Sequence, residues 1–128
     1  MRQTAMALKS FLSQFGVPAY SETSVPDELE LPYITYPIRE PEWREQATFY
    51  SVIWCRTNGY EQALGLADSI MAAIHDGARL ETENGYVILY PANPFCQEMT
   101  GETESQTDED TKGLYINMTM NSYHVAGV

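Results

Sequence analysis

The side chains best suited to chemistry gather in one stretch of the C-terminal half. From Glu98 to Asp110 the sequence holds six carboxylates and no base. Acids that alternate with threonine and serine could imitate a calcium loop, but the glycine and the terminal glutamate of an EF-hand are not at their positions. We therefore interpret the stretch as a solvated charge run. After Glu98, its acids are Glu102, Glu104, Asp108, Glu109 and Asp110.

Nucleophiles and metal ligands form no recognisable arrangement. His75 and His124 are the only imidazoles, and neither has metal-ligand spacing to Cys55 or Cys96. The glycines match no phosphate-binding pattern. We expect two free thiols in a reducing, intracellular compartment. We also expect no catalytic residue, no metal and no cofactor.

Four aromatic residues could form a stacking platform for single-stranded nucleic acid. Such platforms are accompanied by a basic groove, whereas this chain has 7 Lys and Arg against 18 Asp and Glu, a formal charge of −11. That charge repels phosphate and disfavours anionic membranes. No apolar stretch approaches the roughly 20 residues of a membrane span. We therefore expect the four aromatic residues to belong to the core or to an inter-subunit face. They are Tyr50, Trp54, Tyr115 and Tyr123.

Apolar spacing predicts two helices and at least four strands. The helices are expected over 2–15 and 59–75, the second with Asn58 as N-cap and Glu61 completing a capping box. The strands are expected over 31–38, 47–56, 85–90 and 114–123. Pro32 and Pro37 lack the N–H that a ladder needs, which predicts that the first strand lies at a sheet edge.

The strand 47–56 is apolar on both faces, with Phe49, Ile53 and Cys55 on one and Tyr50, Val52 and Trp54 on the other. Such a strand is central in a covered sheet or is covered by another subunit. The element order predicts an α+β fold: an antiparallel-rich mixed sheet of about four to five strands, with two helices packed on one face. Residues 1–128 form one domain, with a long acidic β-hairpin loop over 91–113.

Several segments, taken in chain order, carry a family resemblance. They are Leu31-Pro-Tyr-Ile-Thr-Tyr36, the strand end Ile53-Trp54 with polar turn residues after it, Ala67-Asp-Ser-Ile70, and Asn93-Pro-Phe-Cys-Gln97 before the last strand. Together they resemble the tail terminator, or tail completion, proteins of long-tailed phages and prophages. The resemblance covers about residues 5–123, and its most specific pieces are the first and last segments. The acidic insert Glu102–Lys112 is longer and more anionic than the family pattern.

The resemblance implies helices on one side of a sheet and a homo-oligomer, a hexameric ring. Such a virion structural protein caps the tail tube, ends tube polymerisation and provides the head-joining surface. Its partners are the tail tube protein and the head connector or neck protein, and genome DNA passes through without tight binding. It implies no enzymatic activity. The location it implies is the virion tail, reached from the host cytoplasm during assembly.

Two groups of residues are candidates for these contacts. The two-sided strand and its expected neighbour give a candidate subunit interface of Tyr50, Val52, Trp54 and Tyr115. The hairpin connection gives a candidate docking or lumen loop of Phe95, Gln97, Glu102, Glu104, Asp108, Glu109 and Asp110.

Three alternative hypotheses for the function fit the same sequence. A neck or head-completion protein at the portal side shares the small size and the ring habit. A non-virion intracellular interaction module could use the acidic hairpin to engage a basic partner. A small enzyme with its site scattered over loops is a further alternative, although no cluster of catalytic groups is visible.

Overall fold

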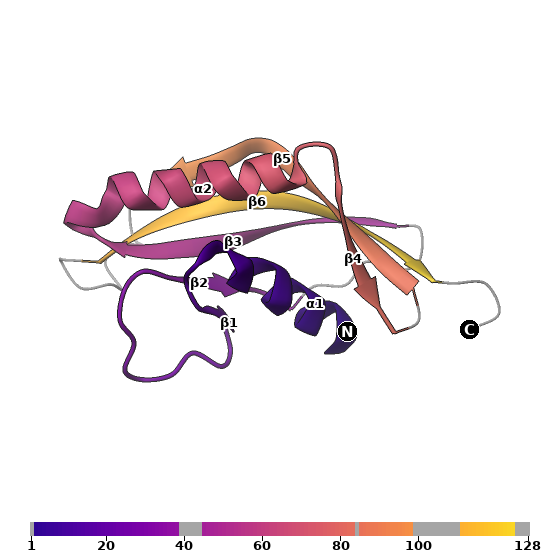
Figure 1. Cartoon of the computed structure of the whole chain (residues 1–128), viewed down its shortest axis with the longest axis horizontal. Coiled ribbons are helices and arrows are strands. Elements are labelled where there is room, and N and C mark those ends of the chain that lie inside the picture. Colours follow the sequence, from indigo (N-terminus) through magenta and orange to yellow (C-terminus); the bar gives the residue numbers. More distant parts are fainter. Residues whose placement is uncertain (1, 39–44, 84, 99–110, 125–128) are drawn as a thin grey trace.

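The computed structural model describes residues 2–38, 45–83, 85–98 and 111–124 (Figure 1). Two α-helices, α1 (Arg2–Leu12) and α2 (Tyr60–Ile74), are accompanied by short 3-10 turns at Ser13–Phe15 and Thr57–Gly59. The strands are β1 (Ala19–Ser21), β2 (Tyr33–Tyr36), β3 (Gln46–Arg56), β4 (Ala78–Thr82), β5 (Gly85–Glu98) and β6 (Thr111–His124).

All six strands belong to one mixed sheet in the order β1-β2-β3-β6-β5-β4. Only β1 and β2 pair in parallel, and every other neighbouring pair is antiparallel. The predicted α+β class is therefore confirmed, with six strands rather than four to five. The two unpredicted strands are the edges, β1 with three residues and β4 with five.

The sheet curls around the two helices, which pack on the same face. Helix α2 contacts the central strands β3, β5 and β6, whereas α1 contacts β1 and β2 at one edge and β4 at the other. Since one helix touches both edges, the sheet bends toward it as part of a barrel, with the helices on the concave side (Figure 1).

Strand alternation builds the core between this face and the helices. In β6, Leu114, Ile116, Met118 and Met120 are all buried, as their spacing of two predicts. The pairing register sets Phe49 and Ile53 of β3, and Leu89 of β5, beside them on the same face. The helices complete the core with Leu8, Leu12, Ala63, Ala67, Ile70 and Ile74.

Glycines end both helical segments. Gly16 and Gly77 have φ angles of 89° and 94°, a conformation that residues with a Cβ rarely adopt. The predicted cap at Asn58 is wrong. Thr57–Gly59 forms a 3-10 turn, so Gly59 becomes the N-cap of α2 and no side chain caps the helix.

Two strand predictions also need correction. The segment around β2 is not an edge, because β1 pairs with it on one side and β3 on the other, and Pro32 and Pro37 flank the strand outside its ladder. The loop predicted over 91–113 is shorter, because β5 continues to Glu98 and β6 begins at Thr111. The remaining connection, 99–110, lies outside the described residues.

The two helix-ending glycines give a matched test of the packing. Gly16→Ala meets no atom within 4 Å, so it should lower the unfolding free energy only by the left-handed strain, about 1–2 kcal/mol. In Gly77→Ala the new Cβ would lie 2.8 Å from a Tyr90 ring carbon, which should cost roughly 1–3 kcal/mol more. Urea denaturation measures both variants, and equal losses would contradict the close approach of Tyr90 to Gly77.

Candidate subunit interface

The convex face of the sheet carries the predicted interface residues. Val52 pairs with Tyr115, Thr35 pairs with Val52, and Gln97 pairs with Tyr115. These four residues form one row across β2, β3, β6 and β5, on the side opposite the buried residues of β6. The structure thus brings together Tyr115 and Val52, predicted for the interface, and Gln97, predicted for the loop.

An aromatic pair stands at the middle of this face. The rings of Tyr50 and Tyr115 meet edge to face, with centroids 4.8 Å apart and planes at 77°, a favoured aromatic geometry. Tyr50 is still 47% exposed and Tyr115 is half-buried. A large ring held in place by another ring while remaining exposed loses little entropy when a partner covers it.

The other two predicted interface residues are more enclosed. Val52 is only 6% exposed, so it supports its neighbours more than it offers surface. Trp54 is half-buried, and its indole Nε1 donates a hydrogen bond to Thr35 Oγ1 at 3.0 Å. The surface available to a partner therefore comes mainly from Tyr50, Tyr115 and one side of Trp54.

The irregular part of β5 is held against β6 by one amide. The register shifts between Pro91 and Cys96, so that Cys96 again pairs with Ile116. Asn117 Nδ2 donates to the Pro94 carbonyl at 2.9 Å and to Gln97 Oε1 at 3.0 Å. This clamp fixes Gln97 beside the Tyr50–Tyr115 pair. Asn117 was not predicted from the sequence, since its role depends on the strand register beyond an irregular segment.

The loop residues named with Gln97 have different surroundings. Phe95 is half-buried and packs against the hydrophobic core. Glu102, Glu104, Asp108, Glu109 and Asp110 lie outside the described residues.

A second aromatic cluster extends this face toward β4. Tyr86 and Tyr123 stack with centroids 5.0 Å apart and planes at 24°, and the Arg79 guanidinium lies 3.8 Å from the centroid of the Tyr86 ring. Arg79 also forms an ion pair with Glu81, with 2.6 Å between Nε and Oε1. Tyr86 and Arg79 were missed from sequence. The sequence did hold a signal for Tyr86, because Tyr86 and Tyr123 lie near the paired ends of the two strands of the last hairpin.

The thiols and Tyr60 have raised pKa values. Burial raises the pKa of Cys55, and burial followed by the charges of Asp68 and Glu98 raises that of Cys96. Both cysteines are free, and raised pKa values keep them as thiols rather than reactive thiolates.

Burial, and next the charge of Glu98, raises the pKa of Tyr60 to about 12. The hydroxyl is buried, and the carboxylate of Glu98 lies near it.

The Asn117 clamp predicts an order of effects for two truncations. Asn117→Ala removes two hydrogen bonds and should lower the unfolding free energy by about 1–2 kcal/mol, whereas Gln97→Ala removes one and should cost about 0.5–1 kcal/mol. Hydrogen exchange should accelerate over 91–97 in Asn117→Ala more than in Gln97→Ala. A larger loss in Gln97→Ala would show that Asn117 is not the clamp.

Tyr60→Phe tests the buried hydroxyl. At neutral pH, where the hydroxyl is protonated in both the folded and the unfolded state, the substitution should change the unfolding free energy by about 1 kcal/mol or less. In the folded wild type the pKa of Tyr60 is raised to about 12, above the value of about 10 in the unfolded chain. Wild-type stability should therefore fall as the pH rises from 10 to 12, and Tyr60→Phe should lack this part of the loss. Unfolding free energies across this range measure the difference, and a pH-independent difference would contradict it.

Among the described residues, no group of three or more His, Cys, Asp or Glu side chains is arranged to hold a metal ion. In the same part of the chain, no helix has the length and apolar character needed to cross a membrane. The chain matches no protein-family model, no curated protein and no solved structure.

Proposed function

We propose that the protein is a tail terminator of a long-tailed phage or prophage: a virion structural subunit that caps the tail tube as a hexameric ring. It ends tube polymerisation and provides the surface to which the head connector or neck protein joins. The proposal rests on the resemblance of the segments in β2, β3, α2 and β5. The ring is assembled from subunits made in the host cytoplasm.

The observation that best supports assembly is the convex face of the sheet, on which neither of the described helices packs. Both helices fill the concave side, while the opposite side presents Tyr50 at 47% exposure in contact with Tyr115. A sheet face that carries exposed aromatic side chains favours a protein partner. A ring needs two different patches that meet between successive copies, and this face supplies one of them.

The charge of the chain is consistent with a conduit for DNA. A formal charge of −11 per chain repels phosphate, which favours passage of the genome over tight binding. The same charge opposes assembly of six copies. Since salt screens repulsion between exposed charges, a moderate rise in ionic strength should stabilise the ring.

The proposed interface can be tested by replacing the exposed tyrosine side chain with a charged one. Tyr50→Lys should weaken ring assembly by about tenfold or more, since a central aromatic anchor is replaced by a charge that must be desolvated. The control is Leu64→Lys, which alters a side chain of α2 that is 41% exposed and lies on the other side of the sheet. Native mass spectrometry at two salt concentrations measures the oligomers, and a ring that dissociates as salt rises would refute the electrostatic argument.

The function itself is tested in the parent phage. Deletion of the gene should give overlong tails, and Leu64→Lys should restore normal length where Tyr50→Lys does not. Tails of normal length without heads would instead indicate the neck or head-completion role. Normal, infectious particles would refute both virion roles.

A further inference from the structure

Strand β4 leaves one side of its backbone open. It is the last strand of the sheet and pairs only with β5. In an edge strand, alternate N–H and C=O groups point away from the single neighbour. Within the described residues, no backbone group bonds to β4 on that side. The strand therefore offers a short unpaired ladder.

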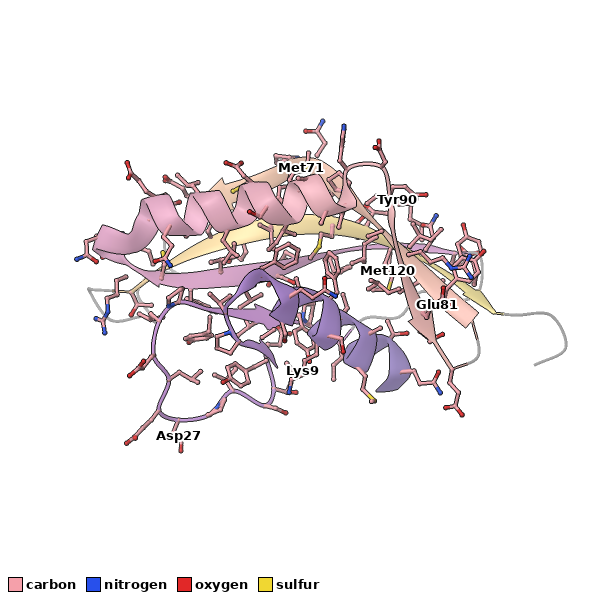
Figure 2. The ribbon with its side chains drawn as sticks, viewed as in Figure 1. Lys9, Asp27, Met71, Glu81, Tyr90 and Met120 are labelled. Carbon is pink, nitrogen blue, oxygen red and sulfur yellow. The ribbon has the colours of Figure 1, made fainter. Side chains whose placement is uncertain are left out.

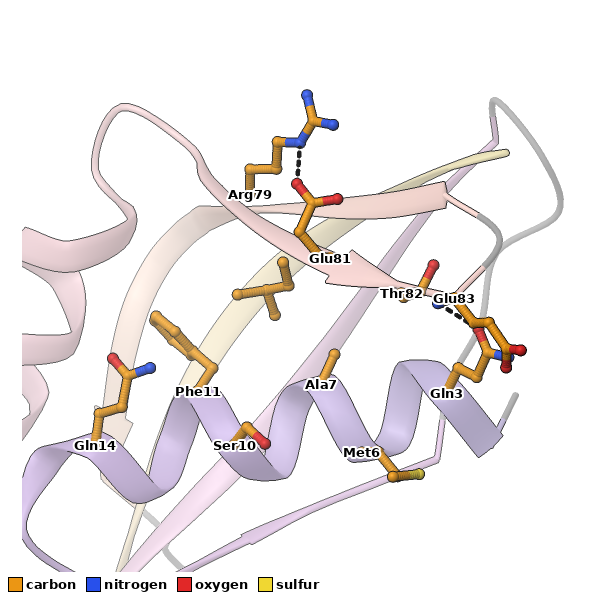
Figure 3. Close-up of a pocket in the computed structure, with 11 residues that line it drawn as sticks. Gln3, Met6, Ala7, Ser10, Phe11, Gln14, Arg79, Glu81, Thr82 and Glu83 are labelled. Carbon is orange, nitrogen blue, oxygen red and sulfur yellow. Dashed lines mark hydrogen bonds and ion pairs between the residues drawn. The ribbon is translucent and has the colours of Figure 1, made fainter. Parts of the chain in front are cut away.

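Helix α1 runs beside this edge and leaves a groove between them. The groove measures about 740 Å³ and is lined by α1 and its following turn on one side and by β4 and Glu83 on the other (Figure 3). Gln3 fixes the helix at one end, because its Nε2 donates to Glu83 Oε2 at 2.6 Å and its Oε1 accepts from the Glu83 N–H at 2.7 Å. The spacing of helix and strand is thus built into the fold.

We propose that this groove binds an extended basic segment of a partner protein, which adds to β4 as a further strand and packs its side chains on α1. An edge strand beside a helix is the arrangement by which PDZ and PTB domains bind peptides through main-chain hydrogen bonds. The inference does not depend on the ring, because it uses the sheet edge and α1 rather than the convex face.

The lining residues specify the character of the segment. Met6 is 58% exposed and offers an apolar contact, while Ser10 and Gln14 add polar groups from the same side of the groove. Of the charged lining residues, Arg79 is already paired with Glu81, and Glu83 adds a further carboxylate. The lining therefore carries one net negative charge, on Glu83, and together with the charge of −11 on the chain it favours a segment with lysine or arginine over a second copy of this protein.

Peptide binding by the purified full chain tests the proposal. The probe is a set of fluorescent, capped nonapeptides in which lysine alternates with valine or threonine, compared with the same peptides carrying glutamate for lysine. We expect saturable binding of lysine peptides, at least about tenfold weaker binding of glutamate peptides, and slower hydrogen exchange of β4 amides in the complex. N-methylation of alternate peptide nitrogens should abolish binding, because the ladder donors are lost.

Two matched variants assign the site. Met6→Lys should weaken binding about tenfold by adding a like charge to the groove, while Leu64→Lys, on α2, should leave it unchanged. Circular dichroism checks that both variants fold. The proposal is overturned if no lysine peptide binds below about 1 mM, if N-methylated peptides bind equally well, or if both variants bind like the wild type. Any of these outcomes would leave the ring proposal unaffected.

Discussion

The alternation of β6 is the constraint on which the rest of the structure depends. This strand lies between β3 and β5, and each side chain along it can face only one side of the sheet. Leu114, Ile116, Met118 and Met120 face the helices and are buried, and burial of each such side chain contributes roughly 1.5–3 kcal/mol. A slip of one residue would exchange this face for its polar and tyrosine positions, so the core fixes which residues are left on the convex side.

Helix α1 turns this one-sided core into a curled sheet. It contacts β4 at one edge and β1 and β2 at the other, so the edges bend toward a common support (Figure 2). Burial of Leu8 and Leu12 holds the helix in the concavity, and the two hydrogen bonds between Gln3 and Glu83 set its distance from the end of β4. Within the described residues, both the groove and the helix-free convex face result from packing the two helices on the same side of the sheet.

The sequence predicted the regular elements and failed where register depends on irregular backbone. The strands 47–56 and 114–123 and the presence of both helices followed from apolar spacing alone. After Tyr90 the alternating apolar pattern of the strand is interrupted by Pro91 and Pro94. Only the register shift before Cys96 shows that β5 resumes its pairing with β6. The short strand β4 has only Ala78 and Leu80 as apolar signals, and the prolines around β2 flank its ladder, which made the edge prediction wrong. The hydrogen bonds of Asn117 to Pro94 and Gln97 depend on this register shift in β5, so they could not be predicted.

The two surfaces differ in charge, and this difference favours different partners for them. The central convex face consists of uncharged side chains, with Tyr50, Trp54 and Tyr115 among polar amides such as Gln97 and Asn117. The groove is bordered by Arg79, Glu81 and Glu83, and the pairing of Arg79 with Glu81 leaves it one net negative charge. Two copies of a chain with charge −11 can meet at the neutral face without opposing buried carboxylates, whereas contact of two copies through the groove would bring their Glu83 carboxylates together. Electrostatics is therefore consistent with the proposed self-association through the tyrosine face and with the proposed basic segment in the groove.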